Sequence, residues 1–323
     1  MATGNANFTA AISRTLQHHD REIVDAVSGQ NALTWLLKSK GNIKVRTGGR
    51  NFTHPILFGT NTSFREYTKY EEIDTPDPDI LTRAEYSQRI LAGSIILSWL
   101  EQAQNAGDKE KLLDYGEEKQ LEGVVSMGEK LSELLWRASP TSTQWESLPK
   151  LVNDSPSTQT DVGGIDPSAS GNTYWRNQTY TTAVTAFNTA STGLTAISTL
   201  VNNASSGPNG PQVHITTKAI WSLYDVGQAG NRRYTHADLA DAGFMNLDYA
   251  GKPVLADSSC TASHWFALNT DQLWLQVLRR GNMITTEATA APKQLADIIL
   301  MYLFGNLTMG DRRTSGVVTN ITG

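Results

Sequence analysis

Apolar residues recur at helical spacing over two long stretches of this chain of 323 residues. Between residues 108 and 138, leucines and valines return every three or four positions with glutamates and lysines between them, which predicts one amphipathic helix. Ser139 and Pro140 end it. At ~1.5 Å per residue this helix would measure roughly 45 Å, more than a small compact domain needs. The same spacing over residues 182–204 predicts a second helix.

The N-terminal residues also contain helical pieces. Ile23, Val24 and Val27 share one side of the first piece, and the leucines of residues 33–37 precede a stop at Gly41. We expect this segment to be an arm that lies against something else.

Three strand-like runs follow the arm, with the sequences IKVRT, HPILFG and FREYTKY. Glycine-containing turns separate them. Pro76 and Pro78 exclude a helix through the acidic stretch TPDPD that comes next.

Residues 83–104 allow two interpretations. Thr82 and Glu85 have the spacing of a helix capping box, which favours a helix. Residues 95–97 are consecutive apolar positions, which a buried strand would explain equally well.

Residues 50–82 therefore form a long extended excursion. Ordering them would cost ~1 to 2 kcal/mol of backbone entropy per residue, whereas a large apolar side chain returns roughly 1.5 to 3 kcal/mol only when it is fully buried. A lone hairpin buries such side chains poorly. We expect a neighbouring subunit to complete the excursion. The apolar side chains concerned are Phe52, Ile56, Leu57, Phe58, Phe64, Tyr67, Tyr70, Ile73, Ile80 and Leu81.

The second half of the chain mixes strands and helices. A strand is expected at QVHITT and a helix from Thr217 onwards. Residues 294–319 are expected to form two strands joined by a turn at Gly310, and the apolar run within the first of them predicts a buried strand. That run is far shorter than the roughly 20 residues that span a bilayer. Further strands are expected over residues 246–249, 252–256, 265–269 and 273–278. The fold class is α+β, without a short internal repeat.

The amino-acid composition excludes several classes of function. The chain has 39% hydrophobic and 18% charged residues, which is typical of a globular protein. With 27 basic and 32 acidic residues its formal net charge is -5, so it lacks the cationic field that grips a phosphate backbone. Cys260 is the only cysteine, which excludes an internal disulfide. Residues 1–20 show no signal-peptide pattern.

One pair of residues could carry catalysis. Cys260 and His264 could be a thiol nucleophile and its base, because a thiolate needs a nearby proton acceptor. No third group and no helix start follow them, so we expect a small apolar residue and a histidine at a strand start instead.

Two sets of residues have the chemistry of metal ligands. His18, His19 and Asp20 are adjacent, so on a helix they would point in different directions. The acidic stretch around Pro76 lacks the spacing and the glycine of an EF-hand, and we expect a solvated loop there. Its members are Glu71, Glu72, Asp74, Asp77 and Asp79. We expect no catalytic residue, no cofactor and no metal.

Two glycine pairs and one arginine pair complete the candidates. Gly48-Gly49 and Gly163-Gly164 match no phosphate-binding motif and are expected to be turns that need positive φ. Arg312-Arg313 is expected at a solvated hairpin tip, with contact to nucleic acid or to a neighbouring subunit as the alternative.

The order of several segments resembles the major capsid proteins of tailed bacteriophages that have the Hong-Kong-97-type coat fold. The resemblance extends over nearly the whole chain from about Gly48 and depends on the order of the segments, since each is weak alone. The segments are GGRNFTHPILFG, the acidic proline-bearing loop, SWLEQAQNAG, LLWRA, VGGIDPSASGNTYWRNQ, HITTKAIWSLYD, GFMNLDYAGKPVLAD, HWFALNTDQLWL and FGNLTMGDRRTSGVVTNIT.

The resemblance implies a division of the chain. It consists of an N-terminal arm (1–43), an extended E-loop hairpin (44–100), a peripheral domain with a long spine helix (101–180), an axial domain (181–256) and axial-domain strands that return to the peripheral domain (257–323). Residues 95–100 would then be the returning strand of the E-loop.

The resemblance also implies a function. The chain would be the major capsid protein of a tailed double-stranded DNA phage, a structural protein and not an enzyme, which self-assembles into hexamers and pentamers of an icosahedral shell. Its partners would be other copies, portal, scaffolding and cement proteins, and packaged DNA contacted non-specifically, without a membrane. It would be made in the bacterial host cytoplasm and reside in the virion. The alternatives are an encapsulin-like nanocompartment shell or a hydrolase that uses Cys260 and His264.

Two details of the family bear on single residues. Some relatives crosslink an E-loop lysine to a neighbour, and Lys69 is the lysine to consider, but nothing identifies its partner and we predict no crosslink. Tyr174, Trp175 and Arg176 are expected to be rigid contact groups at an interface, with a core tryptophan as the alternative.

Overall fold

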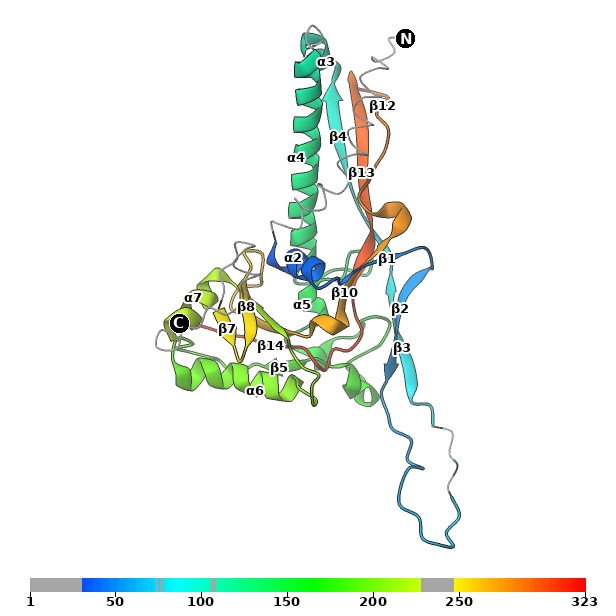
Figure 1. The fold of residues 1–323 in the computed structure, drawn as a ribbon, viewed down its shortest axis with the longest axis vertical. Helices are drawn as coiled ribbons and strands as arrows, with labels where there is room; N and C mark the ends of the chain where they lie inside the picture. The colour runs from blue at the N-terminus through cyan, green and yellow to red at the C-terminus, as the bar shows by residue number, and fades with distance from the viewer. Residues whose placement is uncertain (1–30, 74, 76–77, 106–108, 228–246) are drawn as a thin grey trace.

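The computed structural model describes residues 31–73, 75, 78–105, 109–227 and 247–323. The molecule is elongated (Figure 1): a long helix and two long strands rise from a compact body, and a hairpin descends from the opposite end. The rising elements are α4 (Lys109–Leu135), β4 (Arg89–Ser98) and β13 (Ala296–Met309). The predicted helix of residues 108–138 is therefore confirmed to within a few residues.

The first sheet has six strands and runs the length of the rising part. Its order is β1 (Ile43–Arg46), β10 (Leu273–Leu278), β13 and β11 (Ile284–Thr285), while β4 and β12 (Thr289–Ala290) also pair with β13. β4 and β13 are antiparallel, with Ile96 opposite Ile298 and Ile90 opposite Phe304.

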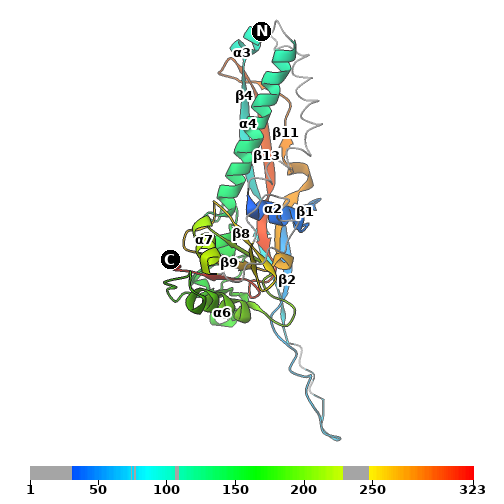
Figure 2. The ribbon, with the colours of Figure 1, turned by 60° about the vertical axis from the view of Figure 1, so that its left-hand side comes forward.

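The helix α4 covers one face of this sheet (Figure 2). A glycine lets the two elements approach, because a Cβ atom at Gly123 would lie 2.6 Å from Cδ1 of Ile95. The sheet side chains that face α4 are buried in one large core; they include Ile95, Leu97, Ile299, Met301 and Leu303.

The second sheet forms the compact body. Its order is β5 (Gln178–Tyr180), β14 (Gly316–Val318), β9 (Trp265–Leu268), β6 (Val213–Thr216), β8 (Lys252–Ala256) and β7 (Leu247–Tyr249). The helices α6 (Thr195–Ala204) and α7 (Lys218–Gly227) pack against it through a separate apolar core that includes Ile197, Trp221 and Trp265. The expected strands and the helix after Thr217 are thereby confirmed.

The remaining elements are short. They are α2 (Ala32–Ser39), the hairpin strands β2 (Asn51–Leu57) and β3 (Leu81–Ser87), α3 (Trp99–Asn105), α5 (Leu148–Leu151), the 3-10 turns η1 (Pro156–Thr158), η2 (Ser170–Trp175), η4 (Thr270–Gln272) and η5 (Arg279–Gly281), and the π-helical turn η3 (Ala190–Leu194).

Residues 83–104 follow the strand alternative at residues 95–97, whereas the helix that the spacing of Thr82 and Glu85 favoured does not form, because both residues lie in strand β3. The chain forms β3 and β4 and then turns into the helix α3 at Trp99. The returning strand expected over residues 95–100 therefore ends at Ser98, because the amide of Trp99 bonds to Leu295 beyond the start of β13.

Four sequence expectations are wrong. FREYTKY forms turns and no strand. Helix α6 begins at Thr195 instead of residue 182, since the amide of Val184 bonds to the carbonyl of Asn320 and draws this part of the chain alongside the C-terminus.

The apolar run of β13 is only half-buried, because alternate side chains face away from α4. Within the predicted arm, α2 belongs to the core of its own chain through Leu33, Leu36 and Leu37; residues 1–30 lie outside the described residues.

Candidate assembly surfaces

The long hairpin has a buried base and an exposed tip. Along β2 the side chains alternate, so Phe52 and Ile56 are 3% and 4% exposed and belong to the main core. The tip, residues 58–80, extends beyond the body (Figure 2). The apolar side chains of the tip and its two flanking positions that remain exposed are Leu57, Phe58, Phe64, Tyr70, Ile73 and Leu81.

Short-range contacts organise the tip. Arg65 forms an ion pair with Glu71 at 2.7 Å and lies 4.4 Å from the ring centre of Tyr67. The hydroxyl of Tyr67 donates to the carbonyl of Ser63 at 2.7 Å. The hydrogen bond from the backbone of Thr68, followed by that from Arg65, lowers the pKa of Glu71. All of these contacts lie within the tip itself, so they shape the loop without covering its apolar side chains.

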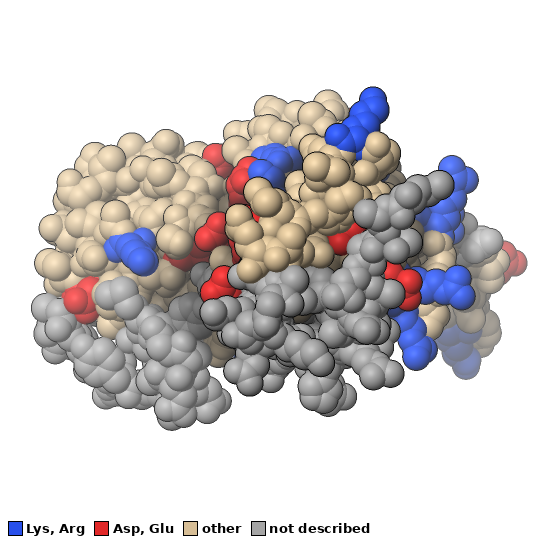
Figure 3. Space-filling model, turned by 90° about the horizontal axis from the view of Figure 1, so that it is seen from above, with Lys and Arg blue, Asp and Glu red and all other residues tan. Residues whose placement is uncertain are grey.

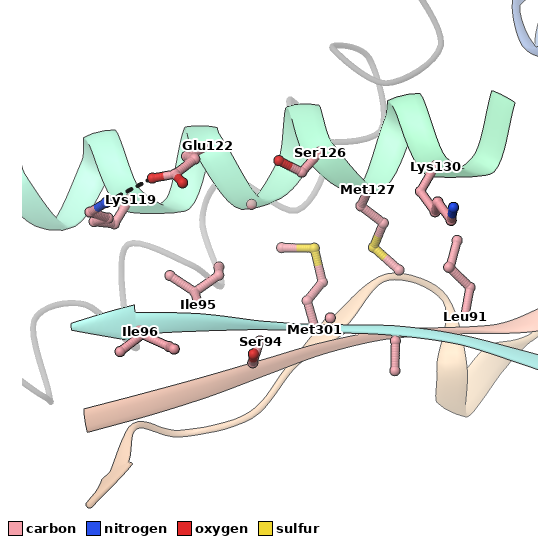
Figure 4. Close-up of a pocket in the computed structure, with 13 residues that line it drawn as sticks. Leu91, Ser94, Ile95, Ile96, Lys119, Glu122, Ser126, Met127, Lys130 and Met301 are labelled. Atoms are coloured by element: carbon pink, nitrogen blue, oxygen red, sulfur yellow. Dashed lines mark hydrogen bonds and ion pairs between the residues drawn. The ribbon is translucent and has the colours of Figure 1, made fainter. Parts of the chain in front are cut away.

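The sheet of the rising part exposes a second apolar surface. Alternate residues of β4 and β13 point away from α4, and Ile90, Ile96 and Leu300 are exposed there. Figure 4 shows Ile96 and Ser94 directed away from the helix. We call this surface the outer sheet face; its apolar members are Ile90, Ile96, Ile298, Leu300, Tyr302 and Phe304.

One end of the outer sheet face is aromatic and basic. The rings of Tyr302 and Phe304 stack at 4.9 Å. The turn η5 lies against Phe304, since a Cβ atom on Gly281 would be 2.3 Å from the Phe304 ring. The exposed side chains of Arg279 and Arg280 belong to the same turn.

A groove of about 400 Å³ separates α4 from β4 (Figure 4). Ile95, Met127 and Met301 point into it from the strand, the helix and β13. Lys119 and Glu122 form an ion pair of 2.8 Å at its rim. The groove is therefore apolar inside and charged at the edge.

Charge is mixed over the end of the molecule that Figure 3 shows, where basic and acidic side chains are interspersed with uncharged ones. Among the described residues, no group of three or more His, Cys, Asp or Glu is placed to hold a metal ion. Glu71 of the acidic stretch is paired with Arg65, whereas Asp74, Asp77 and the histidines at positions 18 and 19 lie outside the described residues. No helix in the described part of the chain is long and apolar enough to cross a membrane.

Arg312 is not at a solvated tip, so that expectation is wrong. Its side chain is fully buried and donates to the carbonyls of Leu151 at 2.7 Å and Trp175 at 2.9 Å. It also donates to the side chains of Gln159 at 2.5 Å and Asn177 at 3.1 Å. The pattern of turn residues before it gave no sign of this, because the acceptors come from a segment more than 130 positions away. Arg313 does lie at the surface, paired with Asp311 at 2.9 Å.

Trp175 is a core residue and not an interface anchor. It is fully buried, and its indole Nε1 donates to the carbonyl of Val162 at 2.8 Å. Tyr174 is half-buried and stacks on Phe58 at 4.8 Å, and Arg176 donates to the carbonyl of Pro167 at 2.7 Å. Tyr174, Trp175 and Arg176 therefore make contacts that stabilise their own subunit.

The glycines before Trp175 fit their expected role. Gly163 and Gly164 have φ of 61° and 74°, and a Cβ atom on Gly163 would lie 3.0 Å from the ring of Tyr86. Of the other pair, Gly49 alone has a positive φ, 113°.

Cys260 and His264 do not form a nucleophile and base. Burial, followed by the charge of Asp257, raises the pKa of the Cys260 thiol far above its usual range. Both ring nitrogens of His264 have other partners, the carbonyl of Ala262 and, at 3.0 Å, a carboxylate oxygen of Asp154. The thiol itself lies 3.7 Å from the carbonyl of Thr261.

Known protein structures resemble this one over nearly its full length. A capsid chain of cyanophage A-1(L) has a TM-score of 0.64 at 15% identity and covers 88% of this chain and 92% of its own. A capsid chain of the Myoviridae phage XM1 has a TM-score of 0.54 at 13% identity, covering 90% and 92%. The SrpI encapsulin of Synechococcus elongatus has a TM-score of 0.53 at 10% identity, covering 89% and 87%. No family model and no curated protein matches the sequence.

The chain has the Hong-Kong-97-type coat fold. The expected α+β capsid fold is thereby confirmed. At identities of 10% to 15% the shared feature is the path of the chain, not its side chains. The coat fold places the exposed hairpin tip and the outer sheet face at opposite ends of the molecule (Figure 1).

Proposed function

We propose that this protein is the major capsid protein of a tailed double-stranded DNA phage, and that it acts by self-assembly into the hexamers and pentamers of an icosahedral shell. The observation that supports this most is the exposed apolar hairpin tip on a coat fold. Phe64, Tyr70 and Ile73 are 88%, 89% and 70% exposed in the single chain. Exposed large apolar groups clustered on one projection are typical of an interaction surface.

The hairpin tip needs an acceptor on a neighbouring copy. The tip is acidic as well as apolar, because Glu66, Glu72 and Asp79 are exposed on it, as are Phe64 and Tyr70. The outer sheet face combines apolar side chains with the basic turn η5. We infer that the tip of one copy lies on the outer sheet face of the next, because both the apolar area and the charges are complementary.

The free energy gained by burying apolar side chains supports a contact between the hairpin tip and a neighbouring copy. A large apolar side chain gains roughly 1.5 to 3 kcal/mol on full burial, and six such side chains are exposed on the hairpin. Association and loop ordering consume much of this gain. A single contact is therefore modest, and a shell becomes stable because each copy is held by several neighbours at once.

The division of the chain follows from this role. We propose that residues 44–100 serve as the E-loop, residues 101–180 as the peripheral domain with α4 as its spine helix, and residues 181–256 as the axial domain around the capsomer centre, with residues 257–323 returning to the peripheral domain. Portal, scaffolding and cement proteins and packaged DNA would be its partners. The protein would be made in the host cytoplasm and would act as a structural protein of the virion.

A hairpin deletion tests assembly without disturbing the fold. Leu57 and Leu81 are register partners, so residues 58–80 can be replaced by an Asn-Gly turn that closes β2 and β3. We expect a folded subunit that forms no shells in negative-stain microscopy. The triple variant Phe64→Ser, Tyr70→Ser and Ile73→Ser should behave alike, while Thr60→Ser in the same tip should assemble normally. Normal particles from the deletion variant would contradict the proposal.

The contents of the particles separate phage from encapsulin. We expect purified particles from infected cells to protect double-stranded DNA from nuclease. Particles filled with one enzyme and free of DNA would keep the shell role but assign the protein to a nanocompartment, which the likeness to the SrpI encapsulin makes the second candidate.

A further inference from the structure

The base of the hairpin is joined to the sheet by a buried chain of polar side chains. His54 of β2 is 8% exposed, and both Gln276 of β10 and Thr308 of β13 are fully buried. Gln276 Nε2 lies 2.7 Å from His54 Nε2 and 3.1 Å from Thr308 Oγ1. Arg46 of β1 completes the chain by donating its Nε–H to Gln276 Oε1 at 3.0 Å. Four strands therefore meet in one network.

The network fixes the protonation of His54. A guanidinium can only donate, so Arg46 forces the oxygen of the Gln276 amide toward itself and the NH2 group toward His54. His54 Nε2 must then accept, which requires a neutral ring with its proton on Nδ1. The hydroxyl of Thr308, 3.1 Å from His54 Nε2, does not alter this: even if it accepted an Nε2–H while donating to the carbonyl of Trp274, that Nε2–H and the NH2 of Gln276 would be two donors 2.7 Å apart.

Protonation of His54 would break the network. An Nε2–H would face the NH2 of Gln276 at 2.7 Å, so two donors would oppose each other. Rotating the Gln276 amide would only move the conflict to Arg46. Because each arrangement leaves one pair of donors face to face, the closed network requires a neutral imidazole.

The surroundings disfavour the positive charge as well. Three titratable groups face His54, namely Lys44 and Arg46 of β1 and Tyr86 of β3. The hydroxyl of Tyr86 donates to the carbonyl of Met309. The side chains that β10 and β13 present to His54 are neutral: Trp274, Gln276 and Thr308. His54 stacks on Trp274 at 4.7 Å, and Lys44 lies 4.3 Å from the ring centre of the same tryptophan. Burial, then the charges of Arg46 and Lys44, lowers the pKa of His54 to about 4.

We propose that His54 is an acid-sensitive latch that holds the base of the hairpin on the sheet when its ring is neutral and releases it when the ring is protonated. The latch is a property of the single chain and goes beyond the shell role, because it controls how firmly the hairpin is oriented whether or not copies assemble. Release means local opening of β2 and β3, in which His54 reaches water and takes up a proton.

The expected pH window follows from the two states of His54. The ring titrates near 6.5 when the base is open and near 4 when it is closed. The open state therefore binds more protons between these values, and the opening equilibrium rises about tenfold for each pH unit of acidification in that window. Above the window, opening is independent of pH.

Hydrogen exchange on the unassembled full chain tests the latch. We expect amides of residues 51–57 and 81–87 to lose protection from pH 6.5 to pH 4.5 by about tenfold per unit, after correction for intrinsic exchange. His54→Gln keeps an acceptor that cannot be charged, so its protection should not change with pH. His264→Gln, remote from the hairpin, should respond as the wild type does. Equal slopes in His54→Gln and the wild type, or no slope in the wild type, would overturn the proposal.

A second measurement needs no variant. In full-length protein labelled with 15N-histidine, His54 should show an unprotonated Nε2 and a protonated Nδ1 at neutral pH. An Nε2–H tautomer, or a ring that titrates near 6.5 in the closed state, would refute the latch even if His54→Gln failed to fold. Neither experiment depends on shell formation, so the latch and the capsid role can fail separately.

Discussion

The guanidinium of Arg312 donates to the carbonyl of Trp175 at 2.9 Å and lies 5.9 Å from the centre of its indole ring. The turn between β13 and β14 and the segment of residues 150–177 are thereby joined by one side chain in the core. Its four acceptors are neutral, and burial lowers the pKa of Arg312 to about 10. The link between these two segments depends on a complete set of hydrogen bonds, because a buried cation has to be satisfied by the carbonyl and amide oxygens around it.

Removing Arg312 should destabilise the subunit strongly. Arg312→Met removes the donor from the buried carbonyls of Leu151 and Trp175 and one donor from the side chains of Gln159 and Asn177. We therefore expect the free energy of unfolding to fall by at least about 3 kcal/mol in urea denaturation of the unassembled protein. Arg313→Met is the matched control. Its side chain is 44% exposed and pairs only with Asp311, so we expect a change below about 1 kcal/mol. Similar effects for both variants would contradict the assignment of Arg312 to the core.

The base and the tip of the hairpin should differ in their effect on stability. Phe52 is 3% exposed, so Phe52→Ala should lower the free energy of unfolding by about 3 to 5 kcal/mol. Phe64 is 88% exposed, and Phe64→Ala should stay within about 0.5 kcal/mol of the wild type. Thermal or urea unfolding of the two variants checks this. A large loss for Phe64→Ala would mean that the tip packs against its own chain.

Two histidines should affect the pH dependence of stability with opposite signs. His214 is fully buried and accepts from the indole of Trp265 at 3.1 Å. Burial, then the charge of Lys252, lowers its pKa to about 3. The unfolded chain binds a proton that the folded chain refuses, so stability falls by up to about 1.4 kcal/mol per unit as pH drops from 6.5 toward 3. His214→Gln should reduce this acid slope by about one proton.

His264 should behave in the opposite way. Burial opposes its charge, but the hydrogen bonds to Asp154 and Ala262 outweigh burial and raise its pKa. A raised pKa stabilises the fold fully below pH 6.5, and this contribution is lost as pH rises through the folded value. His264→Gln should therefore lower stability more at pH 5.5 than at pH 8.5. Urea midpoints measured at both pH values distinguish the two histidines, and a larger loss at pH 8.5 would contradict the Asp154 contact.

Cys260 should be inert in the folded protein. Burial raises the pKa of its thiol, so the thiolate that reacts with maleimide is scarce and shielded. At pH 7.5 we expect labelling at least about tenfold slower than for the same chain in urea. Rapid labelling of the folded subunit would instead revive the hydrolase interpretation.

Local patterns predicted the parts of the fold that local forces decide. The repeat of residues 108–138 gave α4, because apolar positions every three or four residues define one helix face whatever covers it. The same reasoning failed at residue 182, where a hydrogen bond from Val184 to the distant Asn320 replaces helical bonding. Strand residues were recognised in β8, β9 and β10, but their partners could not be, since pairing joins residues far apart in sequence.

The features of the candidate assembly surfaces were likewise predicted only in part from the sequence. A long proline-bearing excursion rich in apolar residues predicted that part of the hairpin is left for another subunit, and Phe64 and Tyr70 are exposed as this requires. The inward direction of Phe52 and the core position of Trp175 were not predictable, because alternation alone does not say which face of a strand meets the core.

The sequence by itself determined the α+β class, the long helix, the projecting hairpin and the order of segments that resembles phage coat proteins. Only the tertiary structure decided that Arg312 is buried, that Cys260 and His264 are apart in function, and that His54, Gln276, Thr308 and Arg46 form one network. The physical reason is that helix periodicity and turn chemistry act over a few residues, whereas burial and hydrogen-bond partners come from strands that the fold brings together from more than 200 positions away.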